Sequence, residues 1–309
     1  MDPLRYRIVR SAGRRGRRRW PAWGLTALFC LAAVPVPEAQ EEPAARFSSG
    51  VQAVEVYATV TDGAGEPVTG LKAADFELDD DRRPQAITTF AEGAFTLTVA
   101  LGVDRSLSMA GEPIRLAKRA AQSFLGQLGP GDRSMVVAIS AEADVVAPLT
   151  AGRDEQAHAI ALLTPWSTTA LRDAVVKTLD RLAPEPGRQA LVVFSDGADR
   201  YSQVSPAQML DRARSGPALV YPIVFGRAPV AALAAIASLT GGRSFVLRDA
   251  SELEGALGSI ARELRHQYLL GYAPAGATDP GRWHPIRVRV RNHEARGWRV
   301  RARDGYWGR

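Results

Sequence analysis

Short apolar runs alternate with amphipathic segments between residues 95 and 265, and this alternation restricts the fold more than any other feature of the sequence. The run at 97–103, LTVALGV, is partly β-branched and uncharged, and similar runs occupy 189–195 and 218–225. Strands that are buried on both faces have this composition, and strands that alternate with helices form parallel sheets. The sequence therefore predicts a Rossmann-like, doubly wound, mainly parallel α/β domain over 95–265.

The periodicity of the apolar residues also predicts the other elements of this domain. We expect further strands at 135–140, 145–149 and 244–247, and helices at 114–128, 154–163, 169–182, 205–214, 231–239 and 251–264. The link between the strands at 135–140 and 145–149 is only Ala141-Glu-Ala-Asp144. A connection this short joins antiparallel neighbours, so these two strands should form an edge of the sheet.

The segments on either side of this domain, 47–94 and 266–309, have the pattern of β structure. In the first segment, extended pieces are expected at 51–58, 68–71, 76–78 and 85–90, separated by turn clusters. The second segment contains a strand at 268–272, followed by runs at 286–290 and 298–302 in which apolar residues alternate with arginine. We interpret the last two runs as a half-buried hairpin, and we expect both segments to combine into one small accessory β lobe.

Residues 1–39 have the organisation of a signal peptide. A basic region between Arg5 and Arg19 precedes an apolar stretch at 22–36, which is short for a membrane span. We therefore expect export to the periplasm, cell envelope or extracellular space, with a leader at 1–39 and a spacer at 40–46. An uncleaved anchor, which would be the one membrane contact, and a twin-arginine route are the alternatives. The single cysteine, Cys30, lies in the leader, so the mature chain would contain no disulfide.

The positive charge of the chain does not indicate a nucleic-acid partner. The formal net charge is +6, but eight of the 39 basic residues and two of the 33 acidic residues lie in 1–39. The remainder carries 31 of each, so it is formally neutral. Because the excess charge belongs to the leader, we expect no nucleic-acid binding.

Three polar stretches follow the expected strands or begin a helix. The motif Asp104-x-Ser106-x-Ser108 follows the strand at 97–103, Thr169 begins a helix, and Asp196 follows the strand at 189–195. Taken singly, each could be a loop, cap or turn residue. A parallel sheet, however, brings the carboxyl ends of its strands to one edge, where α/β proteins place their ligand sites. Their oxygen ligands suit a hard divalent cation.

These five positions resemble the metal-ion-dependent adhesion site of von Willebrand factor A (VWFA, or VWA) domains. The chain as a whole resembles the bacterial VWFA-related family of exported proteins, in which β segments like 61–68 and 268–272 flank such a domain. The resemblance implies Mg²⁺ or Mn²⁺ bound by the Ser106, Ser108 and Thr169 hydroxyls, with Asp104 and Asp196 acting mostly through water. An Asp or Glu carboxylate of a partner protein would complete the coordination. Departures from the family pattern are Gly102, the Ser167-Thr168 pair and Arg172.

The resulting hypothesis is a divalent-metal-dependent protein-binding or adhesion module that is not an enzyme and has no small-molecule substrate. Asp173 and Asp199 are candidates for a supporting position behind the metal ligands, or they are solvated acids. One alternative is an envelope assembly scaffold in which the metal is only structural. Another is a phosphotransfer enzyme that uses Asp104 as its nucleophile. The four histidines form no HExxH pattern, and no serine lies in a G-x-S-x-G motif.

Overall fold

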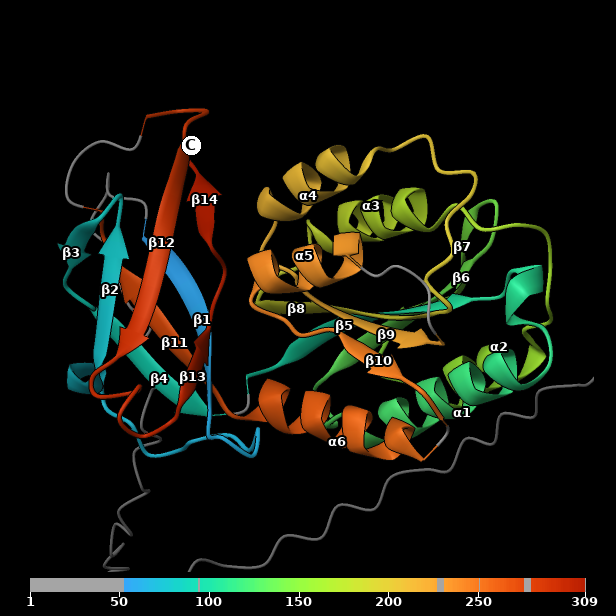
Figure 1. Cartoon of the computed structure of the whole chain (residues 1–309), viewed down its shortest axis with the longest axis horizontal. Coiled ribbons are helices and arrows are strands. Elements are labelled where there is room, and N and C mark those ends of the chain that lie inside the picture. The colour runs from blue at the N-terminus through green and yellow to red at the C-terminus, as the bar shows by residue number, and fades with distance from the viewer. Residues whose placement is uncertain (1–52, 94, 227–230, 250, 275–278, 309) are drawn as a thin grey trace, which may run out of the picture. The chain divides into compact units, whose positions relative to one another are not determined.

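The computed structural model describes residues 53–93, 95–226, 231–249, 251–274 and 279–308 (Figure 1). All of them belong to one compact unit. The expected leader and spacer, with the cleavage site between them, lie outside the described residues. Within the part of the chain that is described, no helix combines the length and apolar character needed to cross a bilayer.

A six-stranded, mainly parallel sheet forms the centre of the α/β part. Its order is β10-β9-β8-β5-β6-β7, and only the edge strand β7 runs antiparallel to its neighbour. The strands are β5 (Leu97–Asp104), β6 (Arg133–Ile139), β7 (Ala143–Thr150), β8 (Arg188–Ser195), β9 (Leu219–Phe225) and β10 (Phe245–Leu247). Every residue of β5, β8 and β9 is buried, as their uninterrupted apolar runs predict. The doubly wound fold and its antiparallel edge pair are therefore confirmed.

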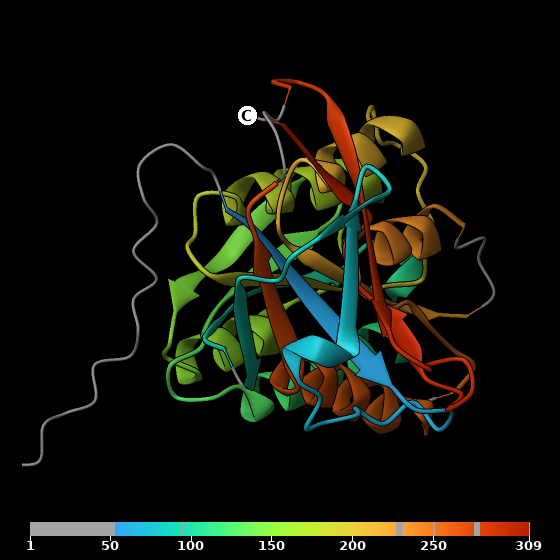
Figure 2. The same cartoon turned by 90° about the vertical axis from the view of Figure 1, so that its left-hand side faces the viewer.

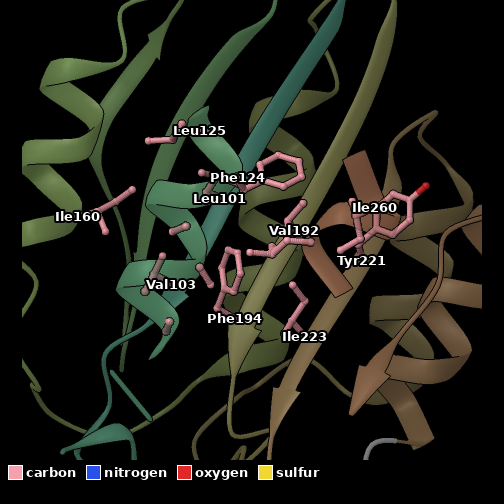
Figure 3. Packing of buried hydrophobic residues seen from close by; sticks show 14 of the residues in the cluster. Leu101, Val103, Phe124, Leu125, Ile160, Val192, Phe194, Tyr221, Ile223 and Ile260 are labelled. Atoms are coloured by element: carbon pink, nitrogen blue, oxygen red, sulfur yellow. The ribbon is translucent and has the colours of Figure 1, made fainter. Parts of the chain in front are cut away.

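Helices cover both faces of this sheet. They are α1 (Glu112–Gln127), α2 (Asp154–Leu162), α3 (Leu171–Leu182), α4 (Pro206–Arg214), α5 (Ala231–Thr240) and α6 (Glu252–Arg265). In Figure 1, α3, α4 and α5 lie on one side of the sheet, and α1, α2 and α6 lie on the other. Figure 3 shows the second of these layers, where Phe124 of α1 and Ile260 of α6 belong to the same buried cluster as Phe194 of β8. The two apolar layers hold the strand ends in place.

The N- and C-terminal segments together form a β lobe, as expected from their alternating patterns. One four-stranded sheet has the order β13-β1-β11-β4, and a second has the order β14-β12-β2-β3. The strands are β1 (Val54–Thr61), β2 (Phe76–Asp80), β3 (Arg83–Gln85), β4 (Thr89–Gly93), β11 (Gln267–Tyr272), β12 (Trp283–Val290), β13 (Arg299–Arg301) and β14 (Gly305–Trp307). Figure 2 turns this lobe towards the viewer, with β1 and β2 crossing at an angle. Buried side chains of both sheets form the core of the lobe.

Three details of the lobe differ from the sequence prediction. The piece expected at 85–90 is not one strand, because 86–88 separate β3 from β4, which lie in different sheets. The runs at 286–290 and 298–302 do not form a hairpin, because β12 pairs with β2 and β14 whereas β13 pairs with β1. The alternating pattern identified the faces of these strands but carries no information about their partners. The piece at 68–71 is also not a strand; the pairing there is a single bridge between Thr61 and Pro67.

Candidate functional site

The strand β5 delivers the first part of the site at its carboxyl end. Asp104 is the last residue of β5 and is fully buried, and Ser106 follows immediately before a short 3₁₀ helix, Leu107–Met109. The Ser106 amide donates a hydrogen bond to Asp104 Oδ1 over 2.9 Å, which turns the chain sharply after the strand. The Ser106 and Ser108 hydroxyl oxygens lie 3.1 Å apart. One carboxylate and two hydroxyls therefore emerge together from this strand.

Thr169 and Asp196 come from neighbouring loops at the same edge of the sheet. Thr169 lies in the loop before α3, and its side chain is nearly inaccessible to solvent. Its carbonyl accepts the backbone amides of Arg200 and Tyr201, each over 3.2 Å, so the loop after β8 is attached to it. Asp196 follows β8 directly, and β8 pairs with β5. Asp196 is close enough for its charge to act on Asp104.

An open depression connects these residues at the surface. It has a volume of about 410 Å³ and is lined by Ser106, Leu107, Ser108, Ser167, Thr168, Thr169, Ala198 and Arg200. The structure thus brings the three expected hydroxyl ligands to one depression. Asp104 lies beneath it, bonded to the Ser106 amide, and Asp196 lies at the end of the adjacent strand.

The burial of Asp104 changes its acidity. Desolvation raises the pKa of Asp104 from its ordinary 3.8 to about 6, and the nearby negative charge of Asp196 acts in the same direction. Hydrogen bonds from Ser195 and Ser106 act in the opposite direction, with Ser195 Oγ donating to Asp104 Oδ2 over 2.6 Å. A buried carboxylate without a cation is energetically unfavourable, so a positive ion in the depression would stabilise the ionised form.

The spacing of the two serine hydroxyls fits two neighbouring ligands of a small divalent cation. Mg²⁺ prefers octahedral oxygen coordination at about 2.1 Å, which places neighbouring ligand atoms about 3.0 Å apart. The hydroxyl oxygens of Ser106 and Ser108 are separated by 3.1 Å, close to that spacing. The candidate residues offer hydroxyl and carboxylate oxygens, the donor type that Mg²⁺ and Mn²⁺ prefer.

Asp173 and Asp199 fasten the loop after β8 to the start of α3. Asp173 accepts the backbone amides of Gln203 and Val204 over 3.1 and 2.8 Å. Asp199 accepts the backbone amide of Arg172 over 2.9 Å, and the Arg172 guanidinium lies 3.2 Å from the same oxygen. Both acids therefore have protein partners that order the loop carrying Asp196. Arg172, one of the departures from the family pattern, belongs to this network.

The other two departures are also accommodated locally. Ser167 adopts a left-handed conformation with φ of 60°, where glycine would be less strained, and its carbonyl accepts the Leu107 amide over 3.0 Å. A Cβ atom at Gly102 would lie only 2.9 Å from Ile139 Cδ1, so the Ile139 side chain occupies the space of the missing one. The Ser167 loop is thus hydrogen-bonded to the loop that follows β5.

Several residues around the site could not be identified as functional from the sequence. Ser195 was expected only as the end of a strand, but its hydroxyl also accepts the Gly197 amide over 3.0 Å and so connects Asp104 to the loop after β8. Leu107, Trp166 and Tyr201 are 65%, 63% and 60% exposed; Leu107 lines the depression, and the other two adjoin lining residues. The only signal for these apolar residues was an aromatic or aliphatic side chain in an otherwise polar loop.

The part of the chain that contains these residues is similar to a known type of domain. Residues 99–198 match the family model described as von Willebrand factor type A domain, which confirms the resemblance to von Willebrand factor A domains for this part of the chain. No curated protein matches the chain.

Three solved structures illustrate the structural similarity. A von Willebrand factor type A structure from Catenulispora acidiphila is 16% identical, with 79% of this chain and 71% of that chain covered and a TM-score of 0.49. Proximal thread matrix protein 1 of the mussel byssus, in a structure with a zinc-occupied MIDAS motif, is 19% identical. The match covers 60% of this chain and 49% of that chain, with a TM-score of 0.48. The vWF domain of the type V pili tip protein Mfa5 from Porphyromonas gingivalis is 13% identical. The match covers 55% of this chain and 95% of that chain, with a TM-score of 0.44.

Proposed function

We propose that the chain, whose residues 99–198 match the model of the von Willebrand factor type A domain, is a module that binds another protein through a divalent cation. Ser106, Ser108 and Thr169 would provide hydroxyl ligands to Mg²⁺ or Mn²⁺, and Asp104 and Asp196 would act directly or through water. The bound cation would supply an electrophilic position for a carboxylate of the partner. Since neutral ligands neutralise little of its charge, the cation would remain attractive to an anion.

The observation that carries this proposal is a desolvated carboxylate beneath an open depression with three hydroxyl-bearing residues. Asp104 is fully buried, whereas Ser108 is exposed in the same depression as Ser106 and Thr169. A cation held between them would touch a buried negative charge on one side and solvent on the other. This asymmetry supports a site that anchors an ion and leaves part of its coordination to a partner.

The side chains around the depression indicate the kind of partner segment that would bind there. The exposed side chains of Leu107, Trp166 and Tyr201 offer apolar surface beside the depression, and Arg200 lines it. Aromatic residues are enriched among those that dominate binding energy in protein interfaces. A partner segment with an Asp or Glu flanked by apolar side chains would match this surface.

The alternatives are less well supported. If the metal were only structural, an open depression bordered by exposed apolar side chains would have no role. A phosphotransfer nucleophile must reach its substrate, whereas Asp104 is fully buried and does not line the depression. We therefore propose a non-enzymatic role. The leader-like 1–39 region further supports action outside the cytoplasm, in the periplasm, the cell envelope or the extracellular space.

The test combines thermal unfolding with capture of a partner. Mg²⁺ or Mn²⁺ should raise the melting temperature of the wild type and of Asp211→Ala, a control that removes an exposed acid on α4, but not that of Asp104→Ala. Immobilised wild type should capture an envelope protein in Mg²⁺ and release it in EDTA, whereas Asp104→Ala should capture none. Equal melting curves with and without cation in the wild type would reject the metal site. Capture that is insensitive to EDTA would reject cation-mediated binding.

A further inference from the structure

A second group of metal-binding side chains lies in the β lobe, away from the sheet that carries Asp104. Asp80 ends β2, Asp81 follows it in the turn to β3, and His284 lies on the neighbouring strand β12. Each of the three residues offers one ligand atom, and these atoms lie within 4.8 Å of one another. None of the three was a candidate site residue in the sequence, because His284 is far from the two aspartates along the chain.

One carboxylate oxygen in this group is buried and has no hydrogen-bond partner. The side chains of Asp80 and His284 are only 5% and 6% exposed. Asp80 Oδ1 lacks a partner and faces His284 Nδ1 over 4.0 Å, while Asp81 Oδ2 lies 2.9 Å from the same nitrogen. A buried carboxylate oxygen without a donor or cation is energetically costly. This oxygen therefore indicates that a positively charged ligand belongs between Asp80 and His284.

The surrounding tyrosines hold the carboxylate in this orientation. The hydroxyls of Tyr272 and Tyr306 donate to Asp80 Oδ2 over 2.9 and 2.8 Å. Burial and the bond to Asp80 raise the pKa of both phenols, so they stay protonated as donors. Tyr306 also stacks on the His284 imidazole, with ring centroids 5.1 Å apart and planes 18° from parallel. Outer contacts of this kind commonly orient the ligands of metal sites.

We propose that Asp80, Asp81 and His284 bind a divalent transition-metal ion, with Zn²⁺ as the best match. Zn²⁺ binds imidazole nitrogen and carboxylate oxygen at about 2.0–2.2 Å, so two ligand atoms of one ion lie at most about 4.4 Å apart. The separations of 2.9 and 4.0 Å from His284 Nδ1 fall within this limit. A nitrogen ligand also favours Zn²⁺ over Mg²⁺ or Ca²⁺, which prefer oxygen alone. Water would occupy the fourth position.

The alternative to a metal ion is a hydrogen bond donated by His284 itself. In that case Nδ1–H would donate to Asp81 Oδ2, but Asp80 Oδ1 would stay unpaired. Arg282 lies 3.2 Å from Asp81 Oδ2 and partly neutralises that carboxylate. A metal ion would contact all three side chains, whereas the proton satisfies only one of the two aspartates. The ion would connect the turn after β2 to β12 and, through Tyr272 of β11, to the other sheet of the lobe.

The experiment uses the full-length chain with Cys30→Ser and Asp104→Ala, which removes the only thiol and the adhesion-type site. Co²⁺ serves as the spectroscopic probe, followed by competition with Zn²⁺. We expect one equivalent of Co²⁺ to bind with visible absorption bands and Zn²⁺ to displace it. His284→Gln should abolish these bands, and Asp81→Asn should weaken binding at least tenfold. His158→Gln, which alters an exposed histidine on α2, should change neither.

Arg282→Ala provides a variant that leaves every proposed ligand in place. Removal of the competing guanidinium should strengthen Co²⁺ binding severalfold, and this result remains decisive if His284→Gln fails to fold. Absence of Co²⁺ and Zn²⁺ binding in the starting variant would overturn the proposal in favour of the histidine proton. Binding that survives both His284→Gln and Asp81→Asn would overturn it in favour of another site. Because Asp104 is already replaced, either result is independent of the function proposed above.

Discussion

Replacement of Asp104 by asparagine removes the buried negative charge of the candidate site with almost no change in shape. The pKa of Asp104 is raised from its ordinary 3.8 to about 6, chiefly by burial. A raised pKa means that the folded state favours the protonated form, so the associated stability is fully present below about pH 4 and is lost as the pH rises through 6. At about 1.4 kcal/mol for each tenfold change in equilibrium, the loss at neutral pH is about 3 kcal/mol.

In the absence of divalent cations, Asp104→Asn should therefore be more stable than the wild type at pH 7.5, by up to about 3 kcal/mol. Asparagine keeps an oxygen for the Ser106 amide, and its amide group can donate to Ser195 Oγ, which replaces the existing bond in the reverse direction. The difference should shrink towards zero near pH 4, where Asp104 of the folded wild type is protonated. With saturating Mg²⁺ the wild type should gain stability and the variant should not.

The assay is chemical denaturation in EDTA and in Mg²⁺, at pH 4, 6 and 7.5. Asp211→Asn serves as the matched control, because Asp211 is an exposed acid whose partner, Arg214, is on the same helix. A variant less stable than the wild type in EDTA at pH 7.5 would refute the electrostatic reasoning. A stability difference that does not change between pH 4 and 7.5 would refute it as well, because no titrating carboxylate would then be involved.

Three further predictions follow, two for the surroundings of this site and one for the junction between α6 and the β lobe. Ser195→Ala removes a bond that lowers the pKa of Asp104, so the pH at which Mg²⁺ binding is half lost should move upward in a titration followed by calorimetry. Trp166→Ala should change the free energy of unfolding by less than about 0.5 kcal/mol, as for other surface substitutions, but should reduce partner capture at least tenfold. Capture equal to that of the wild type would exclude the Trp166 side chain from the interface. Glu263→Gln breaks the ion pairs of the buried Glu263 carboxylate with Arg243 and Arg301. It should therefore lower the free energy of unfolding, measured by urea denaturation, by about 3 kcal/mol. An unchanged free energy of unfolding would show that these ion pairs are not stabilising.

The α/β part could be predicted because its pattern is local and redundant. Strand β5 was expected at 97–103 and is found at Leu97–Asp104, and β8 was expected at 189–195 and is found at Arg188–Ser195. A fully apolar run leaves few alternatives to a doubly covered strand. Once the strands are parallel, topology alone brings their carboxyl ends together. The same reasoning placed Asp104 and Asp196 at one edge without information about any contact.

The β lobe resisted prediction because its structure depends on pairings between distant segments. β2 pairs with β12 across more than 200 residues of sequence, so Asp80 and His284 share no local pattern. Alternation likewise could not show that β12 and β13 belong to different sheets. The partners of Asp173 and Asp199 are backbone amides and an arginine of neighbouring segments, which no motif encodes. Loop conformation, rather than residue type, decides such contacts.

The connection between the α/β part and the lobe also bears on how the candidate cation site would work. Glu263 in the last turn of α6 is fully buried, with its carboxylate 3.1 Å from Arg243 and 2.7 Å from Arg301 of β13. Directly after α6 the chain enters β11, which pairs on both sides, with β1 and β4. A one-turn shift of α6 would cover about 5.4 Å and would break the ion pairs and the strand register together. We therefore expect α6 to keep its position when the candidate site binds a cation and a partner.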